Sequence, residues 1–159
     1  MAVTVADTSP LPYLFQIGHL ELLERLFGTV LVPEAVRDEL QVGRSLGFDV
    51  PDPVRFSWML IRPAPTIPAV ELPALGPGES AALALALETP DSLVLLDDAA
   101  ARAAAARLGL PTTGTLGLLL IAKEQQLIAE VAPVIAILEE RGFRLTEAVR
   151  QRILRLAAE

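Results

Sequence analysis

The chain alternates short apolar runs with longer segments whose apolar residues recur at helical spacing. The runs end at polar residues or proline, which is typical of buried strands in an α/β protein. Strands are predicted at residues 2–6, 29–32, 58–62, 93–96 and 111–113, with 58–62 as a candidate edge strand. Helices are predicted at residues 11–27, 34–41, 79–88, 99–108, 116–126, 131–141 and 146–157.

The segment 79–88 requires a choice between helix and strand because Ala and Leu alternate along it. Both are strong helix formers and no β-branched residue interrupts them, so we expect a buried helix. The alternation of strands and helices then implies an α/β fold, a three-layer α/β/α arrangement around a central, mainly parallel sheet. We expect one domain over residues 1–159, with a proline-rich insertion at about 43–77 and extra C-terminal helices at about 128–159.

Acidic residues stand where these strands end or where these helices begin. They are Asp7 after the first strand, Glu39 on the second helix, Glu79 at the start of the third helix, and Asp97 and Asp98 after the fourth strand. The carboxyl ends of parallel strands form the crevice where open α/β sheets bind ligands. Several carboxylates converging there need a cation, and clustered hard oxygen ligands suit Mg²⁺ or Mn²⁺. The sequence therefore suggests a metal site that acts on phosphates.

Each acid also has a purely structural explanation. Asp7 could form a turn or cap the first helix, Glu79 could complement the dipole at its helix N-terminus, and Glu39 alone is most simply a surface residue. One aspartate could cap the helix predicted at 99–108, but Asp97 and Asp98 together exceed what a cap requires. We favour Asp98 as a metal ligand with Asp97 beside it, and the reverse order stays open.

Polar neighbours could support these acids. The hydroxyls of Thr8 and Ser9 could hydrogen-bond the carboxylates and fix their geometry. Arg102 comes one turn after the aspartate pair and could pair with a carboxylate or contact a substrate phosphate. The turn at residues 114–117, which includes Thr115, could hold a phosphate at a helix N-terminus, although a tight turn is the simpler explanation.

The composition excludes several other kinds of site. Cysteine is absent, which removes disulfides, thiolate zinc sites and cysteine nucleophiles. The lone His19 cannot build a histidine metal cluster or a credible serine–histidine triad. A net charge of −7 disfavours a generic phosphate-binding surface but allows a nuclease whose acids are neutralised by metal. No signal peptide and no apolar run long enough for a membrane span is visible, so a cytoplasmic protein is expected.

Several segments together carry a family resemblance. They are VADTS at residues 5–9, VPEAVRDEL at 32–40, GESAA at 78–82, LLDD at 95–98 followed by Arg102, and the Gly-Thr-x-Gly turn at 114–117. In these segments, roughly within residues 3–125, the chain resembles a PIN domain. It is most similar to an uncharacterised bacterial PIN-like branch, which in turn is similar to the VapC-type toxins of toxin–antitoxin pairs.

The resemblance assigns the acids to a catalytic site. It matches Asp7, Glu39 and Glu79 to the first three acids of such domains, and Asp98 or Asp97 to the fourth. It implies that they ligate one or two Mg²⁺ or Mn²⁺ ions for the cleavage of single-stranded RNA. A small antitoxin protein and a second copy of the chain are the protein partners that the resemblance implies.

Two alternatives to a nuclease stay open. One is a PIN-like module that binds RNA or a protein without cutting. The other is a phospho-acceptor regulator, which is disfavoured because that class places its acid pair at the first strand. A homodimer is expected on apolar helical surfaces made of Tyr13, Leu14, Ile17 and Leu20 or of Val134, Ile137 and Leu138.

Overall fold

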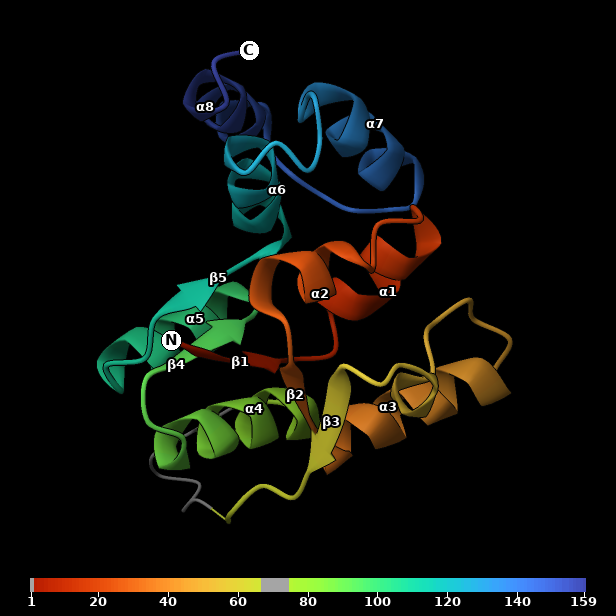
Figure 1. Ribbon diagram of the computed structural model, residues 1–159, viewed down its shortest axis with the longest axis vertical. Coiled ribbons are helices and arrows are strands. Elements are labelled where there is room, and N and C mark those ends of the chain that lie inside the picture. The colour runs from red at the N-terminus through yellow and green to blue at the C-terminus, as the bar shows by residue number, and fades with distance from the viewer. Residues whose placement is uncertain (1, 67–74) are drawn as a thin grey trace.

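The computed structural model describes residues 2–66 and 75–159 and confirms the three-layer α/β/α architecture. A five-stranded sheet has the order β3-β2-β1-β4-β5, with every neighbouring pair parallel (Figure 1). The strands are β1 (Val3–Ala6), β2 (Val30–Pro33), β3 (Met59–Arg62), β4 (Ser92–Leu95) and β5 (Thr112–Thr113). The predicted edge strand at 58–62 is confirmed as β3.

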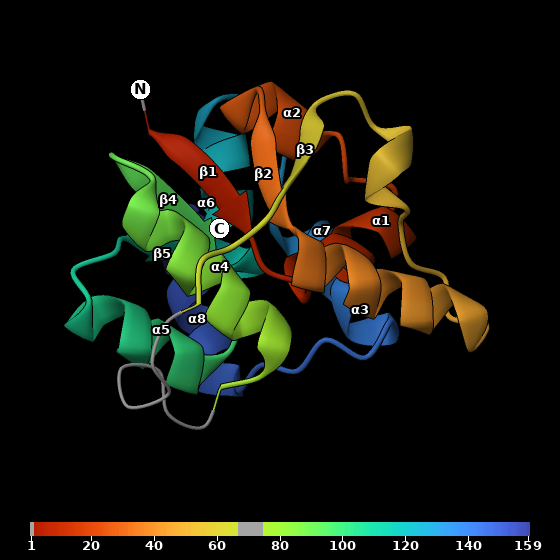
Figure 2. The same ribbon diagram turned by 90° about the horizontal axis from the view of Figure 1, so that it is seen from below.

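Helices cover both faces of the sheet. They are α1 (Pro10–Gln16), α2 (Leu22–Phe27), α3 (Glu34–Ser45), α4 (Pro77–Glu88), α5 (Ala99–Arg107), α6 (Thr115–Glu124), α7 (Ala132–Glu140) and α8 (Glu147–Leu156), with a short 3₁₀ helix η1 (Pro53–Arg55). The neighbouring residues Val5 and Ala6 of β1 belong to different buried clusters, as side chains that alternate across a strand must. Val5 packs with α4 and α5, and Ala6 with a cluster that α1, α2, α6 and α7 share. Figure 2 shows α4 lying against one face of the sheet.

The predicted single helix at 11–27 is wrong, because the structure divides it into α1 and α2. The break comes at Gly18, whose φ of 75° lies in the left-handed region that glycine tolerates best. His19 then donates its backbone N–H to the carbonyl of Leu14 at 2.8 Å, which closes the end of α1. The predicted helix at 34–41 runs further, to Ser45, through Gly43.

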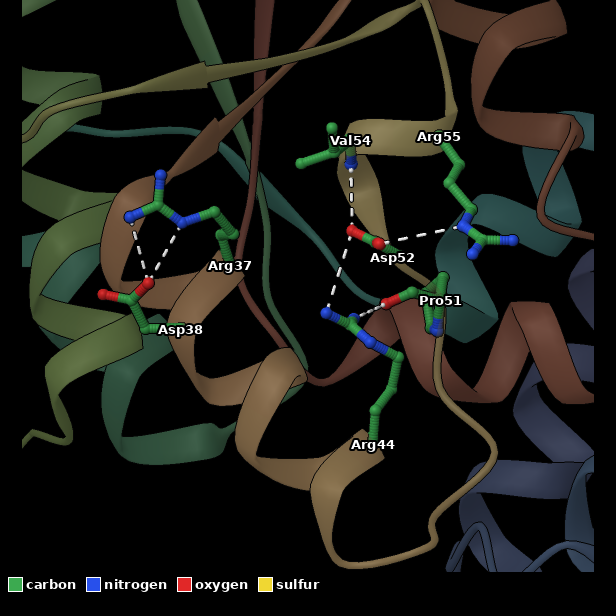
Figure 3. A network of polar contacts seen from close by, with 7 residues as sticks. All are labelled: Arg37, Asp38, Arg44, Pro51, Asp52, Val54 and Arg55. Carbon is green, nitrogen blue, oxygen red and sulfur yellow. Dashed lines mark hydrogen bonds and ion pairs between the residues drawn. The ribbon is translucent and has the colours of Figure 1, made fainter.

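Polar contacts hold the irregular segment after α3 against that helix (Figure 3). Arg44 donates to the carbonyl of Pro51 at 2.8 Å and lies 3.7 Å from the Asp52 carboxylate. Asp52 also accepts the N–H of Val54 at 3.3 Å, as the N-cap of η1. This segment belongs to the expected insertion at 43–77, of which residues 67–74 lie outside the described residues.

The C-terminal helices α6, α7 and α8 gather at one end of the molecule (Figure 1). Glu159 joins two of them, because its carboxylate accepts the Lys123 ammonium at 2.9 Å and the N–H groups of Val131 and Ala132 at 2.8 and 3.0 Å. These donors hold the pKa of Glu159 at about 2, against the cost of partial burial. No helix in the described part of the chain is long and apolar enough to cross a membrane.

The apolar helical surfaces expected to form a dimer contact are mostly used inside the chain. The side chains of Leu14, Leu20, Val134 and Leu138 are buried, and Tyr13 and Ile17 pack against the same core; only Ile137, at 40% exposure, points outward. The premise of that expectation is therefore wrong: α1 and α7 contribute to one shared core. Large exposed apolar side chains gather instead at the end of α3 and just after it, at Val42, Leu46, Phe48 and Val54.

Candidate functional site

The carboxyl ends of β1 and β4 bring two of the acidic positions to one edge of the sheet. These strands are parallel neighbours with Ala6 opposite Leu95, and the N–H of Asp7 donates to the Leu95 carbonyl at 3.0 Å. Asp7 directly follows β1, and Asp97 and Asp98 follow β4. The aspartates thus leave adjacent strands in the same direction, as the sequence predicted.

Asp7 is the buried member of the group, with 3% of its surface exposed. Its Oδ1 atom accepts no hydrogen bond from any described residue. Burial, helped by the nearby charges of Glu79 and Glu39, raises the pKa of its carboxyl to about 7 against the lowering effect of the Thr8 and Ser9 N–H groups. A carboxylate in this position strongly attracts a proton or a cation.

Glu39 lies on α3 and is fixed by donors from two other elements. The hydroxyl of Thr8 donates to Oε2, and the N–H of Gly78 donates to Oε1 at 2.9 Å. A Cβ atom on Gly78 would lie 2.7 Å from Oε2, so this close approach requires glycine. The hydrogen bond from Thr8 to Glu39 agrees with the supporting role expected for Thr8. Gly78 was not recognised from the sequence as part of the site.

Glu79 opens α4, and both of its proposed roles can coexist. Its Oε2 accepts the N–H of Gly76 at 3.1 Å, which is the reach-back contact of a capping box. Its charge also acts on Asp7. Glu79 is half-buried and belongs to the lining of a cavity beside the sheet edge.

The adjacent residues Asp97 and Asp98 make different hydrogen bonds. Asp97 accepts both the N–H and the hydroxyl of buried Thr115, each at 2.7 Å, and so anchors the turn before α6. A Cβ on Gly114 would lie 2.7 Å from Asp97 Oδ1. Asp98 is the N-cap of α5, where its Oδ2 accepts the N–H of Ala101 at 2.9 Å. Asp98 thus has the structural role of a cap, and its Oδ1 accepts no hydrogen bond from the described residues.

A cavity of about 820 Å³ opens beside these residues. Glu79, Asp97, Asp98, Ser9 and Arg102 line one side of it. Asp7 and Glu39 lie outside the lining, so Glu79 belongs both to the cavity and to the group whose charges act on Asp7. No three acidic or histidine side chains of residues 2–66 and 75–159 are arranged closely enough to form a ready-made metal cluster.

The donor set nevertheless suits a hard divalent cation. In the described chain, the only buried side-chain oxygen or nitrogen atoms without a hydrogen-bond partner are Asp7 Oδ1 and Ser9 Oγ, two residues apart. A buried polar atom without a partner is costly, and an ion could satisfy both oxygens. All the candidate ligands are oxygen atoms, which Mg²⁺ and Mn²⁺ prefer.

Comparison with known families supports the resemblance seen in the sequence. A family model described as a PIN domain matches residues 3–159, and so includes the C-terminal helices. Comparison with curated proteins and with solved structures found no match.

Proposed function

Because the chain belongs to the PIN domain family, we propose that it is a metal-dependent ribonuclease that cleaves single-stranded RNA. PIN domains are often nucleases and generally use divalent metal ions. The observation that carries the proposal is the buried carboxylate of Asp7, which has an unpartnered oxygen and a pKa of about 7 beside two further acids. Burial of such a carboxylate destabilises the metal-free protein, and groups with strongly shifted pKa values cluster at functional sites.

We assign Asp7, Glu39, Glu79 and Asp98 as the residues that hold Mg²⁺ or Mn²⁺. Of the two neighbours we prefer Asp98, because its Oδ1 accepts no hydrogen bond from the described residues, whereas both oxygens of Asp97 accept from Thr115. When bound, a divalent ion supplies positive charge at the scissile phosphate and lowers the pKa of an attacking water.

The remaining residues position this chemistry. Thr8 fixes the Glu39 carboxylate, and Thr115 fixes Asp97 and with it the turn before α6. Ser9 lines the cavity, and its buried hydroxyl has no hydrogen-bond partner among the described residues. Arg102 is exposed, lines the cavity and makes no ion pair with a described residue, so its guanidinium is free to contact a substrate phosphate.

The test is cleavage of a labelled single-stranded RNA in Mg²⁺ or Mn²⁺, with EDTA as the metal-free control. Asp7→Asn should abolish cleavage, because it removes one ligand charge at almost constant volume. Asp38→Asn is the matched control: Asp38 neighbours Glu39 in sequence but is exposed and pairs with Arg37. If both variants cut as well as the parent protein, the active site lies elsewhere.

A binding module that does not cut is the second candidate function. The absence of a ready-made three-carboxylate cluster from the described residues favours it. The same RNA assay separates the two functions: RNA that is bound by the parent protein but stays intact in both Mg²⁺ and Mn²⁺ would support the binding module.

The biological setting belongs to the same proposal. We propose a cytoplasmic toxin that is neutralised by a small antitoxin protein and acts as a homodimer. Expression of the chain should arrest growth, and co-expression of a small neighbouring reading frame should relieve the arrest. Light scattering tests the dimer, for which the exposed apolar side chains of Val42, Leu46 and Phe48 now offer the better surface. A monomer mass across micromolar concentrations would refute it.

A further inference from the structure

The wall of the cavity opposite the acids is built by the C-terminal part of the chain. Phe143, Arg144 and Leu145 line it from the connection between α7 and α8, and Arg152 and Ile153 line it from α8 itself. No residue of α8 is fully buried, but Ile153 and Leu154 are partly buried and pack against the main core. The helix is also tied to α7 by the ion pair of Arg150 with Glu139.

The charges around the cavity are separated into two groups. Glu79, Asp97 and Asp98, together with Arg102 of α5, lie on the side of the sheet, while Arg144 and Arg152 lie on the C-terminal side. Neither arginine forms an ion pair with another residue in the described ranges, in contrast to Arg150. The C-terminal side of the cavity therefore presents two guanidinium groups whose donors bind no residue of the described chain.

Unpaired surface arginines are common, and their lack of partners alone indicates nothing. Arg141 and Arg155 of this same region are also exposed and also make no ion pair within the described chain, yet they lie outside the cavity lining. What distinguishes Arg144 and Arg152 is that they line the same cavity as Glu79 and Asp98, two of the proposed metal ligands. A guanidinium group binds phosphate oxygens through paired N–H donors, and RNA carries a phosphate at every nucleotide.

We propose that Arg144 and Arg152 form a phosphate subsite that holds the backbone of single-stranded RNA beside the scissile bond. This inference rests on the proposed ribonuclease function and extends it. In this arrangement the acids act on one phosphate, and the C-terminal wall binds a neighbouring phosphate of the same strand. The subsite explains how a chain with a net charge of −7 could hold a polyanion: the needed positive charge is local to the cavity.

The experiment measures RNA binding without cleavage. Fluorescence anisotropy of a labelled single-stranded oligoribonucleotide, in EDTA and over a range of KCl concentrations, compares the parent protein with Arg144→Gln/Arg152→Gln. The double variant should bind about tenfold more weakly or worse, which corresponds to about 1.4 kcal/mol. Its plot of log affinity against log salt should be shallower by roughly 1.4, because each lost phosphate contact removes about 0.7.

The matched control is Arg141→Gln/Arg155→Gln, which removes the same charge from the same region. If the control pair weakens binding as much, the effect is general electrostatics and the subsite is refuted. An unchanged salt slope in the cavity variant, or no RNA binding by the parent protein, would also refute it. Arg144→Lys/Arg152→Lys should recover part of the affinity, and all the variants should melt like the parent protein because the four arginines are exposed.

Failure of this inference and failure of the proposed function give different results. If the parent protein cuts RNA while the cavity variant binds and cuts equally well, the nuclease stands and the subsite falls. If the parent protein binds RNA through these arginines but does not cut in Mg²⁺ or Mn²⁺, the subsite stands and the nuclease falls.

Discussion

Replacing Asp7 by asparagine should stabilise the metal-free protein above neutral pH while removing its proposed activity. The Asp7 carboxylate is 3% exposed, and its charge is opposed by burial and by the charges of Glu79 and Glu39. Asparagine keeps one acceptor oxygen and nearly the same shape but carries no charge. The substitution therefore removes an unfavourable charge without leaving a void.

The magnitude follows from the pKa of Asp7, which is raised from 3.8 to about 7 in the folded protein. Over this interval the folded protein holds a proton that the unfolded chain has released, so stability falls as pH rises and levels off above about 7. One pKa unit corresponds to about 1.4 kcal/mol. The parent protein should thus lose roughly 2 to 3 kcal/mol relative to Asp7→Asn between about pH 5 and about pH 8.

The assay is urea unfolding followed by circular dichroism in EDTA, for both proteins at several pH values. Groups that do not interact with Asp7 contribute equally to both proteins, so the difference between them reports Asp7 together with its coupling to Glu79 and Glu39. Addition of Mn²⁺ at about pH 8 should then stabilise the parent protein and leave Asp7→Asn nearly unchanged. A stability difference that stays constant from pH 5 to pH 8 would show that the pKa of Asp7 is not raised in the folded protein.

Three further substitutions test the supporting contacts. Gly78→Ala should displace Glu39, because the new Cβ would lie 2.7 Å from its Oε2, and activity should fall at least tenfold while the fold persists. Thr115→Val should weaken the anchor of Asp97 by removing a hydroxyl donor, at a cost of about 1 to 2 kcal/mol in stability and with reduced cleavage. Glu159→Gln should lower the melting temperature at neutral pH, and the difference should vanish as pH falls from 4.5 towards 2, where the parent carboxylate is also protonated.

Each of these substitutions has its own control. Gly43→Ala tests a glycine in α3 whose new Cβ would make only a 3.4 Å contact with Val50, so it should keep full activity. Thr115→Ser restores the hydroxyl and should recover cleavage. Glu140→Gln removes an exposed carboxylate of α7 and should leave the melting temperature unchanged. If the control in any pair behaves like the test substitution, the contact assigned to that pair is not responsible.

Sequence patterns predicted the order of elements well because each strand and most helices have their own local signal. The break at Gly18 escaped prediction because apolar residues at Leu14, Ile17 and Leu20 continue at helical spacing across it. Periodicity reports which face is buried, and here both short helices bury residues in the same core. Only the left-handed backbone at Gly18 separates them.

The sequence predicted where the acidic residues stand in the fold, but not the hydrogen bonds that each of them makes. Residue order alone placed acids at the carboxyl edge of the sheet, because parallel strands all end there. The distinction between Asp97 and Asp98 depends on Thr115, which lies 18 residues further along and meets Asp97 only after β5 pairs with β4. The arginines at 144 and 152 escaped notice for a similar reason, because their place beside the cavity depends on how the C-terminal helices pack.

The hydrogen bonds of the metal-free protein also show that the acids are not equivalent. Asp97 uses both oxygens on Thr115, and Glu39 uses one oxygen on Thr8 and the other on Gly78. Asp7, in contrast, has a buried oxygen without any described donor. Removal of the Asp7 charge should therefore chiefly abolish cation binding, whereas removal of the Asp97 carboxylate should chiefly loosen the turn before α6. The Asp7 variant should lose more affinity for Mn²⁺, and the Asp97 variant should lose more stability. This comparison separates a residue that binds the ion from one that positions its surroundings.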